Sequence, residues 1–532
     1  MKKLPVGIYS FEFIRRHDHI YVDKTRHIYE MITNGMFYFM SRPRRFGKSL
    51  LVTTLWNLFA GRKDLFEGLW IAEHGDWAWE KHPIILLDFN GIPGSTPEEL
   101  RVGLASRLQQ IAKTEDVLLQ DESVERQFQS LILALYKNTA MPVVILIDEY
   151  DKRIIDHLGQ GDAGMKIAHA NRAILKQFFG VLKDTTVASS LRFVFLTGVS
   201  KFSKVSIFSE LNNLNDLTMQ EKYADMLGYT QTELESYFSD YITQLAEKLG
   251  WTLEQVKQEL ARHYNGYRFS DREIKVYNPF SILKAFDELN FKNHWFETGT
   301  PTFLVNLLRE QEVDLPSLEG AISDVTVFSV YDIDHLQPEA LMFQTGYLTI
   351  KAINGELYSL DYPNYEVKTS FGKFLLYAFA QRQEQKISSH VLRLAHHLQA
   401  ENFAAFFESM TAIFAAIPYD IQTKRDEAYY HTIFYLMMSA SGGASQSSLL
   451  TCDGRIDLVV TVKDKVYIME FKCNQSAAIA LQQIKNQGYA DRYRGSDLQV
   501  ILMGINFSSE NRNIAEWQAE SKGVIYPLDS AK

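Results

Sequence analysis

The sequence is poor in cysteine and has no long apolar run, and each shortage excludes a class of protein. Only two cysteines, Cys452 and Cys473, occur among 532 residues, so the disulfide framework of a small secreted domain is excluded. No apolar run reaches the roughly 18 residues that a membrane-spanning helix needs. The first residues also lack the apolar stretch of a signal peptide. We therefore expect a cytoplasmic protein.

Excess positive charge is also missing. The net charge is −10, which argues against a surface broadly coated with nucleic-acid-binding cations. Any contact with nucleic acid must come from local patches. Internal repeats and low-complexity linkers are absent as well. A composition of 46% hydrophobic and 23% charged residues is typical of a globular protein, and the length predicts two to four domains.

The segment SRPRRFGKSL (41–50) ends like a phosphate-binding loop, in which Lys48 would reach the β- and γ-phosphates and Ser49 would bind Mg²⁺. A predicted strand over 35–41 precedes the loop and a predicted helix over 48–61 follows it, so backbone N–H groups at the helix start could hold phosphate. For the GKS tripeptide alone, a chance surface turn is the alternative. The five residues before the GKS glycine should form the loop rim, with positive charge facing the phosphates, and Gly47 itself is also expected to bind the nucleotide. The rim residues are Arg42, Pro43, Arg44, Arg45 and Phe46.

The segment PVVILIDEYDK (142–152) predicts a buried strand that ends in two carboxylates. Asp148 is expected to bind Mg²⁺ through water, and Glu149 to polarise the attacking water. Further strands are predicted within 82–92 and 191–204, and an extra strand between the two motifs is typical of additional-strand P-loop ATPases. Thr197, with Ser200 behind it, is the candidate for sensing the γ-phosphate.

Five segments together resemble the bacterial AAA-ATPase-like family over about residues 1–280. Loops of this family look like RPRRFGKS, so the resemblance identifies Arg42 as part of a variant loop. It also implies ATP as the nucleotide, with Mg²⁺. The segments are YVDKT (21–25), RPRRFGKS (42–49), LIDEYDK (146–152), LTGVSKFSKVSIFSELNNL (196–214) and HYNGYRFS (263–270).

A second group of candidate residues lies within TCDGRIDLVVTVKDKVYIMEFKC (451–473), which predicts a β-hairpin. The hairpin can place Asp457 beside Glu470, and alternation puts Glu470 and Lys472 on one face. Two carboxylates and the Phe471 carbonyl would suit Mg²⁺ or Mn²⁺, while Lys472 could activate the attacking water. Taken alone, a hairpin of this kind is more often structural.

Helices predicted over 426–438 and 479–493 and a strand over 498–508 surround this hairpin, in the order helix, strand, strand, helix, strand. Over about 400–532 the arrangement resembles the PD-(D/E)XK nuclease domain that is commonly fused to this ATPase family. Such domains often carry an acid shortly before the GRID segment. This sequence has none there, and Glu427 is the candidate for an additional metal ligand.

The expected fold is a multidomain α/β protein with three regions. Residues 1–280 form the additional-strand P-loop ATPase domain, 281–400 a mostly helical middle region, and 401–532 the PD-(D/E)XK nuclease-like α/β domain. In the middle region Asn354-Gly355 predicts a hairpin turn that follows a helix over 337–345, as in a winged-helix module.

The expected function is ATP-regulated cleavage of nucleic acid, DNA in particular, with residues 200–216 as the predicted gate. Two alternatives stay open: an ATP-dependent switch whose nuclease fold only binds nucleic acid or a partner, and an oligomerising signalling ATPase with a vestigial nuclease. The sequence does not decide whether the chain forms a homo-oligomer. Lys201, Lys204 and Arg268 are the candidates for a cation that acts on a neighbouring chain.

Overall fold

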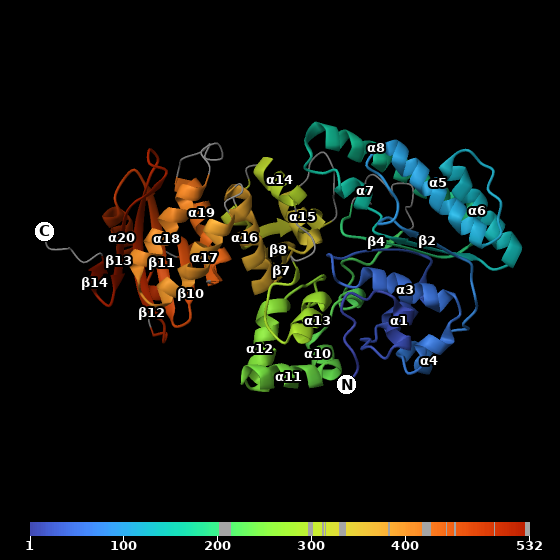
Figure 1. The fold of residues 1–532 in the computed structure, drawn as a ribbon, viewed down its shortest axis with the longest axis horizontal. Helices are drawn as coiled ribbons and strands as arrows, with labels where there is room; N and C mark the ends of the chain where they lie inside the picture. Colours follow the sequence, from blue (N-terminus) through green and yellow to red (C-terminus); the bar gives the residue numbers. More distant parts are fainter. Residues whose placement is uncertain are drawn as a thin grey trace. The chain divides into compact units, whose positions relative to one another are not determined.

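The computed structural model divides the chain into two compact units, one formed by Met1–Gln311 with Ile322–Asn364 and the other by Glu312–Ala321 with Tyr365–Lys532 (Figure 1). These limits differ from the three predicted regions, whose division at 280 and 400 stays a prediction. The structure describes all residues except 202–213, 296–301, 311–312, 314, 329–336, 381–383, 418–426, 443, 452–453, 494 and 527–532.

The first unit contains a five-stranded sheet in the order β2-β3-β4-β1-β5, and the pairings along it are parallel. The strands β1, β3 and β4 are buried along almost their whole length, which explains their continuous apolar sequences. The strand predicted between the two motifs along the chain, β2, lies outside β3, and β4 is the strand that lies between β1 and β3. This order confirms the additional-strand fold class. The strands are β1 (Phe37–Ser41), β2 (Ile84–Asp88), β3 (Val143–Asp148), β4 (Leu191–Gly198) and β5 (Asn215–Asp216).

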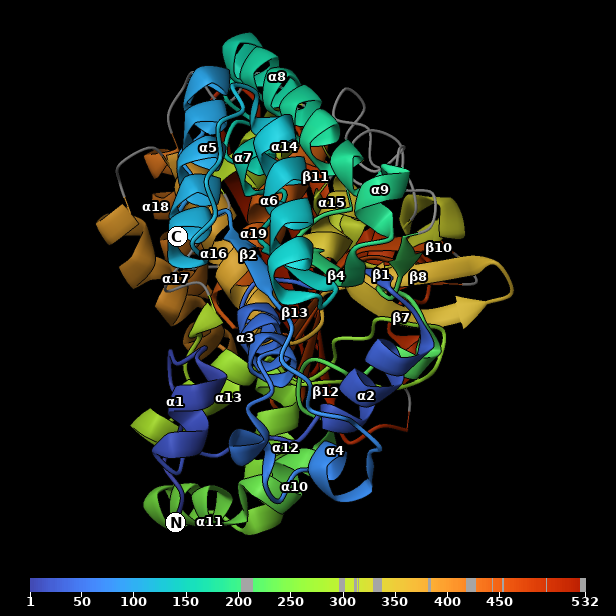
Figure 2. The same cartoon turned by 90° about the vertical axis from the view of Figure 1, so that its right-hand side faces the viewer.

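Helices cover both faces of this sheet, with α5, α6 and α8 on one side and α1, α3 and α4 on the other (Figures 1 and 2). Thr96 and Ser123 cap α5 and α6 with side-chain oxygens that accept from backbone N–H groups. The helices are α1 (Phe11–Arg16), α2 (Thr25–Asn34), α3 (Lys48–Phe59), α4 (Trp70–His74), α5 (Pro97–Thr114), α6 (Val124–Thr139), α7 (Lys152–Ile155), α8 (Gly161–Gly180) and α9 (Thr185–Ala188).

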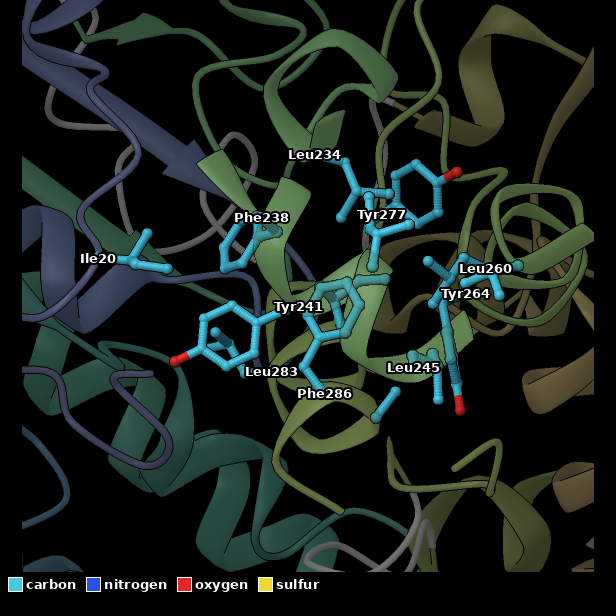
Figure 3. Close-up of a cluster of buried hydrophobic side chains, with 14 of the residues drawn as sticks. Ile20, Leu234, Phe238, Tyr241, Leu245, Leu260, Tyr264, Tyr277, Leu283 and Phe286 are labelled. Atoms are coloured by element: carbon cyan, nitrogen blue, oxygen red, sulfur yellow. The ribbon is translucent and has the colours of Figure 1, made fainter. Parts of the chain in front are cut away.

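A small helical subdomain follows the sheet and packs around its own apolar core (Figure 3). The core includes Phe238, Leu260 and Phe286, and also takes up Ile20 and Val22 from the N-terminal segment. The N-terminal segment is thereby held against these helices, and the Tyr241 hydroxyl also donates to the Lys2 carbonyl at 2.7 Å. The helices are α10 (Gln231–Tyr237), α11 (Ser239–Leu249), α12 (Leu253–Tyr264) and α13 (Pro279–Glu288).

The predicted helix and hairpin of the middle region are both present. Gly346 ends the helix with φ 87°, and Gly355 forms the turn with φ 63°, which are backbone conformations that favour glycine. The elements of this part are α14 (Thr302–Glu310), β6 (Ala321–Asp324), α15 (Pro338–Thr345), β7 (Thr349–Asn354) and β8 (Leu357–Asp361).

The second unit contains a six-stranded sheet in the order β14-β13-β12-β11-β10-β9, in which only the β11–β12 pairing is parallel. Two expectations were wrong in detail. An additional strand, β9, precedes the hairpin, and the helix expected over 479–493 ends at Asn486. The strands are β9 (Ala444–Thr451), β10 (Gly454–Val462), β11 (Lys465–Cys473), β12 (Gln499–Ser508), β13 (Asn513–Ser521) and β14 (Val524–Tyr526).

Helices of the second unit pack against both faces of its sheet. Phe434 of α19 contacts Phe471 of β11, whereas Leu481 and Ile484 of α20 pack with Ile468. Glu319, from the short piece 312–321, accepts from the Tyr435 hydroxyl at 2.9 Å and pairs with Lys368. Among the residues that the structure describes, no helix is long and apolar enough to cross a membrane. The helices are α16 (Tyr365–Ala380), α17 (Glu384–Gln399), α18 (Phe403–Ala416), α19 (Glu427–Ala440) and α20 (Ala477–Asn486).

Candidate active sites

The phosphate-binding loop leaves β1 and enters α3 at Gly47, whose φ of 95° is left-handed. The other loop residue with a left-handed backbone is Arg45, with φ 70°. Arg42, at the first glycine position of the motif, does not have a positive φ, so this position does not need glycine. The variant loop is therefore compatible with a strand–loop–helix arrangement that directs backbone N–H groups toward an anion.

The prediction that Arg42 lies on the loop rim and faces the phosphates is wrong. Its side chain is buried, with 1% exposed, and its guanidinium donates to the carbonyls of Ser41, Thr218 and Tyr223 at 3.0, 2.8 and 3.1 Å. Its guanidinium carbon also lies 4.3 Å from the ring centroid of Phe269. Burial lowers the pKa of Arg42 to about 9, so it stays charged at neutral pH and serves as an internal anchor.

Phe46, predicted to contact the nucleotide, is buried with its ring against those of Tyr267 and Phe269 at 4.8 and 5.3 Å. Its side chain points into the protein, and only its backbone is left for an anion. The HYNGYRFS segment thus supplies the apolar support under the loop.

Beside the loop lies a cavity of about 490 Å³. Lys48, Ser49 and Glu149 line it, and Lys48 Nζ lies 3.4 Å from Glu149 Oε1. Lys48 also donates to the carbonyls of Arg42 and Pro43 at 3.2 and 3.3 Å. The cavity has an apolar part and a charged part, and further lining residues are Ile8, Tyr9, Arg44, Arg45, Asn90, Asp151, Lys152, Tyr229, Phe280 and Leu283.

Asp148 ends β3 as predicted and is 4% exposed. Burial and the negative charge of Glu149 raise its pKa to about 6, although a hydrogen bond from Ser49 and the charge of Lys48 act in the opposite direction. Its Oδ1 atom is buried and accepts no hydrogen bond from the described residues. A bound cation would satisfy this oxygen, so Ser49 and Asp148 fit a Mg²⁺ site.

Glu149 follows with φ 51°, a left-handed conformation that is uncommon for a residue with a side chain. Such strain tends to persist where the surrounding structure holds a functional group in place. The carboxylate of Glu149 is partly exposed and lines the cavity, as expected of a group that must reach a water molecule.

Thr197, the predicted γ-phosphate sensor, does not line this cavity. It is buried, and its hydroxyl donates to the Met40 carbonyl of β1 at 2.7 Å, so it joins two neighbouring strands. Ser200 donates to Asp151 through its backbone N–H and its hydroxyl, both at 2.6 Å. The residue of this strand end that reaches the cavity wall is Val199.

Asp151 is a site residue that sequence reasoning missed. It is fully buried, accepts from the N–H groups of Val199 and Ser200, and thereby ties the turn after β3 to the end of β4. Burial and the charge of Glu149 raise its pKa to about 6. The only signal in the sequence was a third carboxylate three residues after Asp148. An aspartate in that position is easily taken for the cap of the following helix, because the sequence does not show that the end of β4 lies beside it.

Two of the three candidates for a cation that acts on another chain, Lys201 and Arg268, are engaged in contacts within this chain. Lys201 pairs with Asp216 at 3.1 Å, and its backbone N–H donates to Gln344 of α15 at 2.8 Å. Arg268 is buried and donates to the carbonyls of Ser270 and Asp271. Lys204, like most of the predicted gate 200–216, lies outside the described residues.

The hairpin of the second unit brings the predicted carboxylates together. The register pairs Leu458 with Met469, which places Asp457 opposite Glu470, and Asp457 Oδ2 accepts from the Phe471 N–H at 2.9 Å. Glu470 is 2% exposed. Its Oε1 accepts from Gln483 of α20, whereas its Oε2 is buried and accepts no hydrogen bond from the described residues.

Burial and the charge of Asp457 raise the pKa of Glu470 to about 8, although the Lys472 ammonium opposes the rise. Buried carboxylates that face one another disfavour ionisation, and a divalent cation between them would reverse this. The donors are hard oxygens, so Asp457 and Glu470 fit Mg²⁺ or Mn²⁺.

Lys472 lies on the same face as Glu470, as predicted, with 3.5 Å between Nζ and Oε1. It donates to the Phe471 carbonyl at 2.8 Å, the oxygen expected to be a metal ligand. Glu427, the expected additional ligand, lies 3.9 Å from Lys472 Nζ. Among the described residues no three acidic, histidine or cysteine side chains are close enough to hold a metal ion, so the site offers two carboxylates.

Comparisons with known proteins find a known family in each of the two parts of the chain that contain these residues. A family model described as a predicted AAA-ATPase matches residues 5–208, and a model of the PD-(D/E)XK nuclease superfamily matches residues 425–517. The chain is also 37% identical over 533 residues to a protein of Azotobacter chroococcum mcd 1 described as an uncharacterized protein in the vnfD 5′ region. That alignment covers 98% of this chain and 99% of the relative.

The contact between β4 and Asp151 leads to a first prediction. A Cβ on Gly198 would lie 2.3 Å from Asp151 Oδ1 and 2.8 Å from the Tyr150 ring, so Gly198→Ala should destabilise the first unit by about 1–3 kcal/mol. Scanning calorimetry should show a lower unfolding temperature. The matched control is Gly180→Ala at the end of α8, where a Cβ meets open space and stability should be unchanged or raised. Equal unfolding temperatures for both variants would contradict the prediction.

Proposed function

The chain belongs to the AAA-ATPase-like family and carries a PD-(D/E)XK nuclease superfamily domain, and from this premise we propose an ATP-regulated nuclease. It would bind and hydrolyse ATP with Mg²⁺ and cut nucleic acid, DNA in particular. One observation supports both halves of the proposal. Asp148 at the end of β3 and Glu470 within β11 each hold a buried carboxylate oxygen with no hydrogen-bond donor among the described residues, and each lies near a lysine.

In the ATPase half, the phosphates would lie over the start of α3, where Lys48 exchanges its contact with Glu149 for the terminal phosphates. Ser49 and Asp148 would hold Mg²⁺, which neutralises phosphate charge. Glu149, released from Lys48, would accept a proton from the attacking water. The apolar part of the cavity, with Ile8, Tyr229 and Leu283, suits the base and sugar.

In the nuclease half, Asp457 and Glu470 would hold a Mg²⁺ or Mn²⁺ ion, which supplies a polarised water and neutralises the scissile phosphate. Lys472 would orient that water or the phosphate. Gln483 restrains one oxygen of Glu470, which directs the other oxygen toward the metal position.

A nuclease-like domain that binds nucleic acid without cutting it is a second candidate. Lys472 donates to the Phe471 carbonyl and lies between Glu470 and Glu427. It thereby separates Glu427 from the other two carboxylates, so the described site offers Asp457 and Glu470 alone as acidic metal ligands. If Lys472 stays there, a metal would bind weakly and the domain would act as a nucleotide-controlled binding module.

Control by ATP would use the end of β4. Asp151 holds Val199 and Ser200, and the next residue, Lys201, donates from its backbone to Gln344 of α15. A change at the phosphates can therefore be passed through Glu149 and Asp151 to the predicted winged-helix-like module. A gate of this kind requires that ATP bind two states with different affinity.

The ATPase site leads to a prediction about two variants. Lys48→Ala should abolish ATP binding, because it removes a cation at the phosphate-binding helix start. Glu149→Gln should bind ATP but stop hydrolysis, because an amide cannot accept the proton. Titration calorimetry and phosphate release test these outcomes, with the exposed Lys63→Ala as the control. Equal ATP affinity of Lys48→Ala and the unaltered protein would refute the site.

The nuclease site predicts a different division of effects. Asp457→Ala and Glu470→Ala should each lose cleavage and bind Mn²⁺ more weakly, as should removal of metal by a chelator. Lys472→Ala should lose cleavage but keep Mn²⁺, because it is not a ligand. Asp464→Ala, an exposed carboxylate at the turn of the same hairpin, is the control. If the unaltered protein cuts no linear, circular or single-stranded substrate with either metal, the binding-only function replaces this one.

The rate of nucleic-acid cleavage under different nucleotide conditions tests whether the two halves are coupled. Cleavage by the unaltered protein, Glu149→Gln and Asp151→Asn should be measured without nucleotide, with ATP and with ADP. Glu149→Gln with ATP should hold the nuclease in one state, because hydrolysis cannot reset the gate. Asp151→Asn should bind ATP but respond less, since the amide retains size but loses part of its hold on β4. Identical rates in all conditions would show that the two halves are merely tethered.

A further inference from the structure

Two arginines of the phosphate-binding loop, Arg44 and Arg45, are exposed and line the cavity beside Lys48. In the part of the chain that the structure describes, neither guanidinium forms an ion pair with a carboxylate. This sets them apart from the other cations at the cavity, because Lys48 lies 3.4 Å from Glu149 and Lys152 pairs with Asp156 at 3.0 Å.

The backbone that carries these arginines is held on both sides. Arg42 before them is anchored by three carbonyls, and Phe46 after them is packed between aromatic rings. The carbonyl of Arg44 itself accepts from the Trp295 indole at 3.3 Å. Because the residues on both sides and the Arg44 carbonyl are held in place, the side chains of Arg44 and Arg45 are the part of the loop that is directed outward.

The side chain of Arg45 is also placed. Its guanidinium carbon lies 4.5 Å from the ring centroid of Phe280 at the start of α13, an arrangement that orients the charge without neutralising it. Partial burial and the nearby charge of Arg44 lower the pKa of Arg45. Two like charges that face one cavity are stabilised when an anion lies between them.

The other cations considered for contact with the phosphates are held by contacts within the chain. Arg268 and Arg42 are buried and donate to backbone carbonyls, and Lys201 pairs with Asp216. Within the described residues, Arg44 and Arg45 are therefore the arginines at the cavity that can move onto a nucleotide.

We propose that Arg44 and Arg45 act in the same chain as the cations that stabilise the phosphoryl group during transfer, so that hydrolysis needs no residue from a second chain. This inference rests on the proposed ATPase function. In the step, a water oxygen bonds to the γ-phosphorus while the bond from that phosphorus to the β–γ bridging oxygen breaks. Glu149 takes the proton of the water, the bond electrons stay on ADP, and the two guanidiniums face the charge on the transferring oxygens.

The first test separates binding from turnover. Arg44→Ala and Arg45→Ala should bind ADP like the unaltered protein but lose roughly 100-fold or more in kcat. Their affinity for ADP with aluminium fluoride, which imitates the transferring phosphate, should fall by a similar factor. Arg45→Lys should recover only part of kcat, because one ammonium cannot bridge two oxygens. Arg26→Ala is the matched control, since Arg26 also lies over an aromatic ring, Trp70, but away from the cavity.

The second test separates action in the same chain from action on a neighbour. Turnover per molecule should stay constant as the protein is diluted, and mixing Glu149→Gln with the double variant Arg44→Ala/Arg45→Ala should restore no activity. Recovery on mixing would show that the arginines act between chains and would overturn the proposal, as would an unchanged kcat in both single variants. If the unaltered protein binds no ATP, the proposed function itself has failed, and that result is distinguishable from the other two.

Discussion

The guanidinium of Arg42 is buried among the carbonyls of Ser41, Thr218 and Tyr223, and the geometry of the phosphate-binding loop depends on it. A buried cation is costly without acceptors, so the chain brings the distant carbonyls of Thr218 and Tyr223 to its Nη atoms, whereas its buried Nε has no acceptor among the described residues. Thr218 follows β5, and Tyr223 leads toward the helical subdomain. The interaction therefore fixes the loop, the sheet edge and the following segment in one arrangement, which a glycine at this position could not do.

Both units use the same electrostatic device at their candidate sites. A carboxylate on a strand of the sheet is buried, a second carboxylate lies beside it, and a lysine only partly compensates the charge. The raised pKa values of Asp148 and Glu470 report the same cause, which is burial together with a neighbouring negative charge. Carboxylates arranged in this way are unfavourable when ionised without a nearby cation, and this supports the proposal that each site takes up a divalent metal ion.

The sequence was sufficient for β1, β3 and β4 of the first sheet, because their apolar runs are continuous and buried on both faces, but it did not reveal the two-residue strand β5. It was also sufficient for the meeting of Asp457 and Glu470, because a two-residue turn fixes the register of the hairpin. It failed for β9, whose sequence ASQSSLLT is mostly polar and lacks the apolar alternation of a strand. It also failed for Thr197 and Arg42, because residue type and position do not reveal which neighbour a polar side chain will contact. Asp151 was missed for the same reason.

The chain passes from one compact unit to the other at 311–312, returns at 321–322 and passes again at 364–365. The ten residues 312–321 are needed by the second unit, where Glu319 holds Lys368 and Tyr435. A single break in the chain, or a single point of gene fusion, therefore cannot separate the two halves cleanly. A fragment beginning at 365 would lack part of its own core, so a free nuclease domain could not be released by one cut. The interleaved path therefore makes the folding of each unit depend on an uninterrupted chain through the other.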